Sequence, residues 1–235
     1  MGDFKGKIVG IFPDLWKNIF LRHIQSGIIG NGHDVFHAAR VAQCAFEIAE
    51  TLDVARLAGV AGLCHNADRI IQYDLKVGRG AVSEELIRNL VDDWLTFTDL
   101  TGQERALVLD AVLGHDLPND AQDNSVLVAL KDADRLVNLE PDAIMRTAQF
   151  YADFPAVDPI HWLADPSATH REPKSIIRCL RSNAEWGNFS NTKFGIRLPR
   201  AQQRATELTD YLLNYIEKTH ECWIKAGLLP FTPPQ

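Results

Sequence analysis

The sequence predicts an all-α fold, and three observations support this. Apolar residues recur at spacings of three and four in most segments after residue 34, which is the periodicity of helices with one buried face. Patterns that alternate apolar and polar residues, as half-buried strands do, are rare. Several of the periodic segments follow a Ser, Thr, Asp or Asn, the residue types that cap helix N-termini.

The first strongly periodic segment runs from Val35 to Thr51 and places Val41, Cys44 and Ile48 on one helical face. Asp34 precedes it, and its carboxylate can accept the unpaired amides of the first turn. His37 falls in that first turn. The stretch before it is rich in glycine, so we expect an irregular approach to a well-capped helix.

The second segment, Val54 to Ile71, has an apolar first half and a polar second half. This predicts a buried helix that ends at a functional edge, with His65 and Asn66 at that edge. At the N-terminus, Pro13 and Asp14 interrupt a short apolar run, which argues against a secretion signal or a membrane span there.

Three further helices follow, and each has a recognisable start or end. Ser83 begins SEELIRNLVDDWL, and Thr101 with Glu104 begins GQERALVLDAVLGHD. The third helix lies between Asn124 and Leu139, and Pro141 marks its end.

The C-terminal third predicts an irregular crossing followed by helices. Residues 151–173 are rich in Pro, Asp and His, which favours a long surface loop. Helices resume near Ser175 and from 200 to 224, and the tail is irregular. We expect a single domain over residues 1–235, with a core at about 30–140 and a C-terminal helical elaboration over 141–235 that serves as a lid.

Composition excludes several classes of protein. The chain has 235 residues, 46% of them hydrophobic, which suffices for a core without disulfides or a structural metal. The formal charge of −7 argues against nucleic-acid binding along the whole chain, and nothing predicts sequence-specific recognition. The four cysteines form no CxxC pair, and no apolar run approaches about 18 residues. We therefore expect a cytoplasmic protein that does not cross the membrane.

Histidine and aspartate residues at helix ends are the candidates for chemistry, because the common phosphate-loop, dinucleotide and zinc motifs are missing. Asp132 and Asp134 lie within an otherwise apolar helix, where a carboxylate needs a partner or a cation. Nothing in their spacing selects His33, His161 or His170.

The order HDVFHAARV, AGLCHN, LKDADRLVNL resembles the HD-domain superfamily of metal-dependent phosphohydrolases. In that family a first His, a later His-Asp doublet and a distal Asp bind a divalent cation. The resemblance covers roughly residues 32–139 and implies that His37, His65 and Asp134 are metal ligands. The element ADRLVN is also similar to one in alarmone hydrolases, and that similarity implies that Asn138 contacts a nucleotide.

Asn66 departs from the family, because it stands where the doublet has Asp. An amide oxygen is a poorer ligand than a carboxylate for a hard cation, which favours one metal ion over two. We keep Asn66 as a fourth ligand, with a helix cap as the alternative. Asp68 is the candidate for the carboxylate that takes a proton from water.

Five more residues are assigned around this site. Arg40 lies one turn after His37 and Arg69 one turn after His65, so both are candidates to bind the substrate phosphate, with ordinary salt bridges as the alternative. His115 is a candidate catalytic residue, with a helix-end cap as the alternative. Trp186 and Phe189 are candidates for stacking on a base or for packing.

Basic residues also concentrate between Arg171 and Arg204, with only Glu172 and Glu185 as acids. They predict either a rim that attracts phosphate or a solvated helix face paired with acids elsewhere.

The resulting prediction is a phosphohydrolase that binds one divalent ion (Mn, Mg, Co, Ni, Fe or Zn) and cleaves a nucleotide or other small phosphate ester. Alternatives are a ligand-binding or regulatory protein that has lost hydrolysis through Asn66, and an HD-fold oxygenase with two irons. The partner is expected to be a small phosphorylated substrate, and a homodimer is left open.

Overall fold

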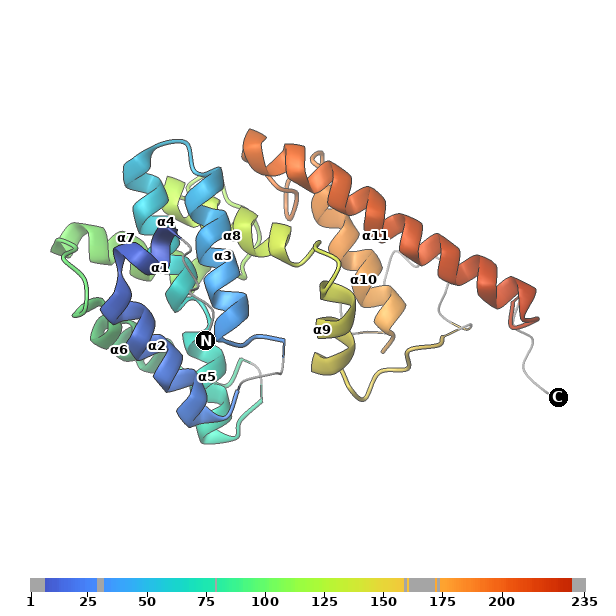
Figure 1. Ribbon diagram of the computed structural model, residues 1–235, viewed down its shortest axis with the longest axis horizontal. Helices are drawn as coiled ribbons and strands as arrows, with labels where there is room; N and C mark the ends of the chain where they lie inside the picture. Colours follow the sequence, from blue (N-terminus) through green and yellow to red (C-terminus); the bar gives the residue numbers. More distant parts are fainter. Residues whose placement is uncertain are drawn as a thin grey trace.

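The computed structural model describes residues 7–28, 32–78, 80–158, 160, 172 and 174–229, and within those ranges it is helical and has no strand (Figure 1). The helices are α1 (Lys7–Ile11), α2 (Pro13–Ser26), α3 (Val35–Ile48), α4 (Leu52–Cys64), α5 (Ala67–Leu75), α6 (Glu84–Leu95), α7 (Gly102–Gly114), α8 (Ser125–Val137), α9 (Ala143–Phe150), α10 (Ile176–Ala184) and α11 (Pro199–Lys225), with a 3₁₀ turn η1 (Glu185–Gly187). The predicted all-α class is confirmed.

Helices α3, α4, α7 and α8 form the centre of the molecule. Helix α3 packs along α4 and α8, and α4 also packs against α7 and α8. The α3–α4 contact is close because α4 carries Gly62: a methyl group there would lie 2.6 Å from the Cα of Ala42. Such an overlap would force the helices apart. Gly62 therefore fixes the distance between the two helices that carry His37 and His65.

Capping residues begin the central helices where the sequence predicts. The Asp34 carboxylate accepts hydrogen bonds of 3.0 Å from the amides of Phe36 and His37. Thr101 and Glu104 form a reciprocal capping box at the start of α7. The side chains of Ser83 and Asn124 cap α6 and α8 by accepting hydrogen bonds from backbone amides of the first turn.

The segment 54–71 forms two helices, and the first ends just before His65 and Asn66, the edge that the sequence predicts. Helix α4 ends at Cys64, and α5 begins at Ala67 after a change of direction at His65 and Asn66 (Figure 1). The N-terminal helices α1 and α2 were not predicted. Pro13 separates them: α1 ends two residues before it, and Pro13 occupies the first turn of α2, where its missing amide hydrogen costs nothing.

Helices α9, α10 and α11 lie together beyond the end of α8, with α11 running as one long rod along their outer side (Figure 1). Asp132 of α8 joins this part to the centre. Its buried carboxylate accepts hydrogen bonds from the backbone amides of Arg197 (2.8 Å) and Leu198 (2.6 Å). This contact explains an aspartate within a buried helix face without a cation. The boundary at 141 stays a prediction.

Part of the predicted irregular crossing, residues 151–158, consists of turns and bends. His161, His170, Arg171 and the tail from residue 230 lie outside the described residues. Helix α9, which precedes this crossing, was not predicted, because its eight residues show too few turns for a clear period.

Three cysteines, Cys44, Cys64 and Cys179, are buried thiols, and Cys222 is exposed. Burial raises the pKa of Cys44 to about 12, so this thiol packs as a small apolar group. None of the helices in the described ranges combines the length and apolar character that a membrane crossing requires.

Candidate metal centre

The break between α4 and α5 places His65 at the base of the candidate site. The residue is 2% exposed, and its Nδ1 donates to the carbonyl oxygen of Gly62 at 2.7 Å. A neutral imidazole has one protonated nitrogen, so this bond leaves the lone pair on Nε2. That buried Nε2 has no hydrogen-bond partner. The Nε2 atom is thus a buried acceptor that receives no hydrogen bond.

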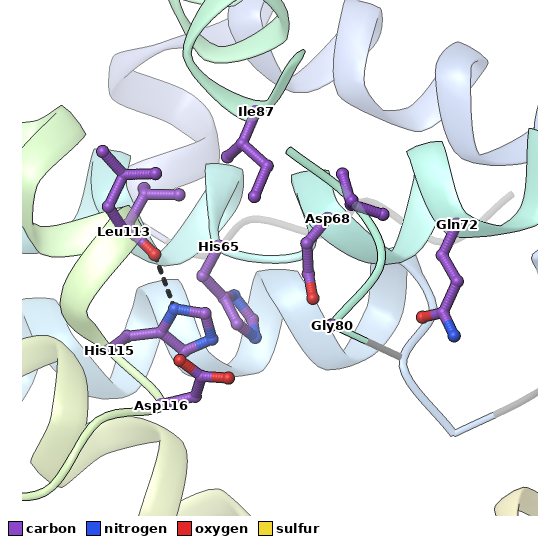
Figure 2. Close-up of a pocket in the computed structure, with 10 residues that line it drawn as sticks. His65, Asp68, Gln72, Gly80, Ile87, Leu113, His115 and Asp116 are labelled. Atoms are coloured by element: carbon purple, nitrogen blue, oxygen red, sulfur yellow. Dashed lines mark hydrogen bonds between the residues drawn. The ribbon is translucent and has the colours of Figure 1, made fainter. Parts of the chain in front are cut away.

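His115 faces His65 from the end of α7. Its Nδ1 donates to the carbonyl oxygen of Val112 at 2.7 Å, which likewise leaves a lone pair on Nε2. The two ring centroids lie 5.3 Å apart. Figure 2 shows both rings at a small cavity of about 180 Å³, with Asp116 beside His115 and Asp68 on the other side of His65.

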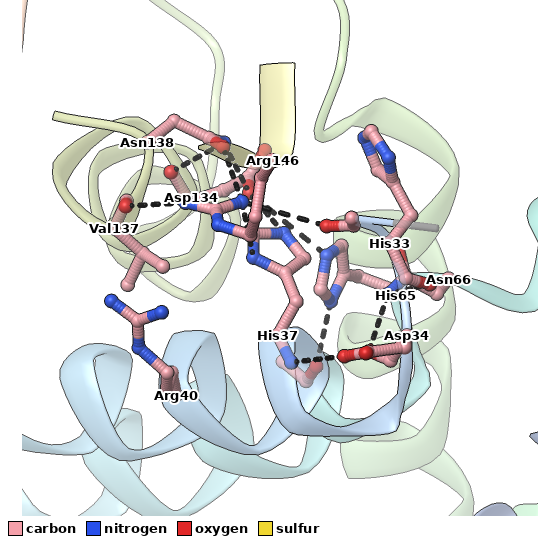
Figure 3. A network of polar contacts seen from close by, with 12 residues as sticks. His33, Asp34, His37, Arg40, His65, Asn66, Asp134, Val137, Asn138 and Arg146 are labelled. Carbon is pink, nitrogen blue, oxygen red and sulfur yellow. Dashed lines mark hydrogen bonds and ion pairs between the residues drawn. The ribbon is translucent and has the colours of Figure 1, made fainter. Parts of the chain in front are cut away.

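His37 and Asp134 complete a cluster with His65 (Figure 3). The Oδ1 atom of Asp134 lies 3.1 Å from Nε2 of His37 and 3.9 Å from Nε2 of His65. One atom from each of the three residues lies within 4.8 Å of the others. Residues from α3, α8 and the α4–α5 break therefore converge on one point.

Burial controls the protonation of this cluster. It lowers the pKa of His65 to about 3 and also lowers the pKa of His37, so both rings are neutral at pH 7. Burial alone would raise the pKa of Asp134, but the hydrogen bond from His37 and the other nearby imidazoles outweigh it and hold that pKa below its usual value. Two neutral imidazoles and an ionised carboxylate are the charges that these groups carry when they bind a cation.

The three residues fit a divalent ion. Atoms bound about 2.1 Å from one ion lie at most about 4.2 Å apart, and both distances from Asp134 Oδ1 are shorter than this. Imidazole nitrogen with carboxylate oxygen suits Mn, Fe, Co, Ni and Zn. The lone pair of His65 Nε2, buried without a donor, is the group that an ion would satisfy.

Asn138 and Arg146 surround Asp134 on the side away from His65 (Figure 3). The Asn138 amide nitrogen donates to Asp134 Oδ1 at 3.0 Å, and its oxygen accepts from Arg146 Nη1 at 3.0 Å. Arg146 Nη1 also lies 3.3 Å from His37 Nδ1. Arg146 was not predicted as a site residue, because it comes from α9 and only packing brings it here.

Asn66 directly precedes α5, and its side-chain amide binds the backbone of the segment before α3. Its Nδ2 donates to the carbonyl oxygens of His33 at 3.1 Å and Asp34 at 3.5 Å. The contacts tie the α4–α5 break to the start of α3, where His37 lies. Ligation of a metal by Asn66 stays a prediction.

Arg40 does not join the cluster. Its guanidinium forms ion pairs with Glu140 and Asp142, the salt-bridge alternative that the sequence left open. In Figure 3 it lies below the cluster, apart from His65 and Asn66. The contacts of Arg40 therefore follow the salt-bridge alternative, and its assignment to a substrate phosphate stays a prediction. Arg146 is the arginine that contacts the cluster.

Arg69 and Asp68 lie close together at the start of α5. The Nε of Arg69 is 3.4 Å from Asp68 Oδ2, and its Nη1 donates to Gln72. His33, for which the spacing gave no signal, packs against His37 with ring centroids 5.6 Å apart, and against Phe150 at 4.5 Å. Its place four residues before His37, at a helix start, was the one available clue.

A larger cavity of about 670 Å³ opens beside Asp134. Four of its lining residues, His33, His115, Asn138 and Arg146, also contact the cluster. Aromatic residues line it as well: Phe150, Tyr151, Trp186 and Phe194. The cavity joins the cluster to a surface that combines aromatic faces with polar groups, and it is large enough for a small organic ligand.

The basic segment does not form a rim around this cavity within the described residues. Lys174 pairs with Asp153, Arg197 with Asp123, and Arg204 with Glu47 and Glu140. These basic residues pair with acids in other parts of the chain, which is the second of the two alternatives that the sequence left open.

No protein-family model matches the chain, and no curated protein matches its sequence. Solved structures do resemble it. One is an HD-superfamily hydrolase from Bacillus thuringiensis, 20% identical, with a TM-score of 0.57 over 90% of this chain and 97% of the other. Another, from Lactobacillus plantarum, is 12% identical, with a TM-score of 0.60 over 92% and 98%. The chain has the HD-domain fold.

Proposed function

We propose that the protein is a metal-dependent phosphohydrolase that acts on a nucleotide or another small phosphate ester. One divalent ion would be held by His37, His65 and Asp134. The observation that carries this proposal is the buried lone pair of His65 Nε2, which has no donor and lies 3.9 Å from the Asp134 carboxylate. The resemblance in fold to an HD-superfamily hydrolase supports it.

A bound divalent ion lowers the pKa of a coordinated water and offsets negative charge on phosphoryl oxygens. The chain supplies the proton acceptors. His115 Nε2 carries a lone pair because Nδ1 is bonded to Val112, so it can take a proton from an attacking water. Asp68 is the second candidate, since it lines the same small cavity as His65 and His115.

The larger cavity supplies substrate contacts. Arg146 and Asn138 line it beside Asp134, where they can donate hydrogen bonds to phosphate oxygens. Trp186 lines the same cavity and offers an aromatic face for a base. These positions support a substrate that has a phosphate at one end and a planar group at the other.

The test is metal content, followed by turnover. Untagged protein purified without chelator is compared by inductively coupled plasma mass spectrometry with His65→Ala, Asp134→Ala and the control His220→Ala, which alters a histidine of α11 outside the cluster. We expect near-stoichiometric metal in the wild type and the control, and loss in the other two. The loaded wild type is then screened against phosphorylated metabolites. Wild type that refuses every added divalent ion would overturn the proposal.

A binding protein without hydrolysis is the second candidate, and Asn66 favours it. The amide at this position donates to two backbone carbonyls, a task that a carboxylate cannot perform. Metal binding without turnover of any screened phosphate ester would support this candidate.

A further inference from the structure

The contact between Arg146 and His37 determines which nitrogen of His37 carries the proton. A guanidinium only donates hydrogen bonds, so His37 Nδ1, 3.3 Å from Arg146 Nη1, must be the acceptor. The proton of the neutral ring then lies on Nε2, which donates to Asp134 Oδ1 at 3.1 Å. Both neighbours of His37 thus favour the same tautomer.

This tautomer cannot bind a metal ion through Nε2, the atom that belongs to the candidate centre. Ligation there requires a lone pair on Nε2, and the proton must move to Nδ1. A protonated Nδ1 would face a donor of Arg146 across 3.3 Å, which is unfavourable. The Arg146 contact and metal ligation by His37 therefore exclude each other.

We infer that Arg146 is a positioning residue that holds His37 in its non-ligating tautomer, so that metal uptake requires Arg146 to release His37. The inference rests on the proposed function, because it concerns the same metal centre. Release breaks only one of several contacts: Arg146 also donates to Asn138 Oδ1, to the Val137 carbonyl oxygen and to Asp142. The guanidinium can thus stay at the cavity, where it would meet an anionic substrate.

The first test is the affinity for Mn²⁺, measured by competition with a chromophoric chelator. Arg146→Met removes the donor, and Arg146→Gln replaces it with an amide whose oxygen can accept from Nδ1–H. Arg40→Met is the matched control, because Arg40 also carries a positive charge and also donates to Asp142, but it does not contact His37.

We expect both Arg146 variants to bind Mn²⁺ about tenfold more tightly than the wild type, since a charge-assisted hydrogen bond no longer opposes binding. Arg40→Met should differ by about twofold at most. Equal affinities in the Arg146 variants and Arg40→Met would overturn the inference and leave the metal centre intact. Absence of binding in every protein would overturn the metal centre and the inference together.

The second test observes the tautomer itself and does not depend on affinity. Nitrogen-15 spectra of the histidine rings should show His37 of the metal-free wild type protonated on Nε2, and of the Zn²⁺-loaded protein protonated on Nδ1. A His37 already protonated on Nδ1 without metal would contradict the inference, even if the Arg146 variants bind more tightly.

Discussion

The side-chain amide of Asn66 donates to the backbone carbonyl oxygen of His33 at 3.1 Å, across the turn that precedes His37. The same nitrogen lies 3.5 Å from the carbonyl oxygen of Asp34. A residue at the expected place of a metal ligand therefore acts as a donor to the backbone. Because Asn66 is a donor here, replacing it with aspartate should have a distinct effect on stability and on metal binding.

Asn66→Asp should destabilise the metal-free protein and strengthen metal binding. The carboxylate would face carbonyl oxygens without a proton to donate, at a cost of about 1 to 3 kcal/mol in the free energy of unfolding. A cation would offset that cost, so Mn²⁺ should raise the melting temperature more in Asn66→Asp than in the wild type. Thermal unfolding with and without Mn²⁺ measures both effects.

Asn66→Ala is the control for this prediction, because it removes the donor without adding charge. It should be destabilised without the extra gain from Mn²⁺. If the alanine and aspartate variants respond alike to the ion, the carboxylate does not reach the metal centre. A large gain of hydrolysis in Asn66→Asp alone would favour the view that the wild type is a binding protein.

The burial of His23 should lower the free energy of unfolding at acidic pH. Its ring is fully buried in α2, and burial lowers its pKa below the ordinary value of about 6.5. Below pH 6.5 the unfolded chain therefore binds a proton at this residue that the folded chain does not. The free energy of unfolding should fall as the pH falls, by up to about 1.4 kcal/mol per pH unit from this residue.

The measurement is urea denaturation between pH 5 and 8 of the metal-free wild type and His23→Leu. The slope against pH should be smaller in the variant below pH 6.5, and the two slopes should coincide above it. Parallel curves over the whole range would mean that His23 has the same pKa in the folded and the unfolded chain.

Local signals predicted the central helices, and long-range packing supplied what they missed. Asp34 and Thr101 cap their helices as expected, because capping depends on residues three apart. Arg146 and His37 are 109 residues apart in the sequence, and they meet only because α9 packs beside the first turn of α3. Spacing within a segment contains no information on such a contact.

The same reasoning explains why the sequence left two roles open for Arg40. Arg40 follows His37 by one helical turn, a spacing that allows either a phosphate or an acid as its partner. The acids that decide, Glu140 and Asp142, belong to the turn after α8. Their position relative to α3 depends on how α8 packs, which the sequence pattern does not reveal.

Two aspartates of α8 should respond differently to substitution. Asp132 accepts two backbone amides near the start of α11, so Asp132→Ala should lower the free energy of unfolding by about 2 to 4 kcal/mol. The folded fraction should keep its metal. Asp134→Ala should instead lose metal, with a smaller change in the stability of the metal-free protein. Denaturation and metal analysis of both variants test this difference. Loss of metal in Asp132→Ala without loss of stability would contradict the structural role of Asp132.

His115→Gln should slow turnover without loss of metal. The predicted acceptor is Nε2 of His115, and removal of a proton acceptor lowers kcat by roughly 10²- to 10⁴-fold. The ring lies outside the three-residue cluster, so the metal content should match that of the wild type. If metal is lost with activity, His115 is a ligand. If activity persists, Asp68 becomes the better candidate for the acceptor, and Asp68→Asn is the variant to measure next.

Trp186 tests whether the planar part of the substrate is a base. Its ring lines the cavity beside Asp134, and a base stacked on it would gain about 1 to 3 kcal/mol. Trp186→Ala should then raise KM for a nucleotide by roughly 5- to 100-fold while kcat changes little, because the contact is remote from the phosphate. Phe189→Ala is the matched control: Phe189 follows three residues later, is 40% exposed and does not line the cavity. An unchanged KM in Trp186→Ala would argue for a phosphate ester without a base, since the aromatic wall would then serve packing alone.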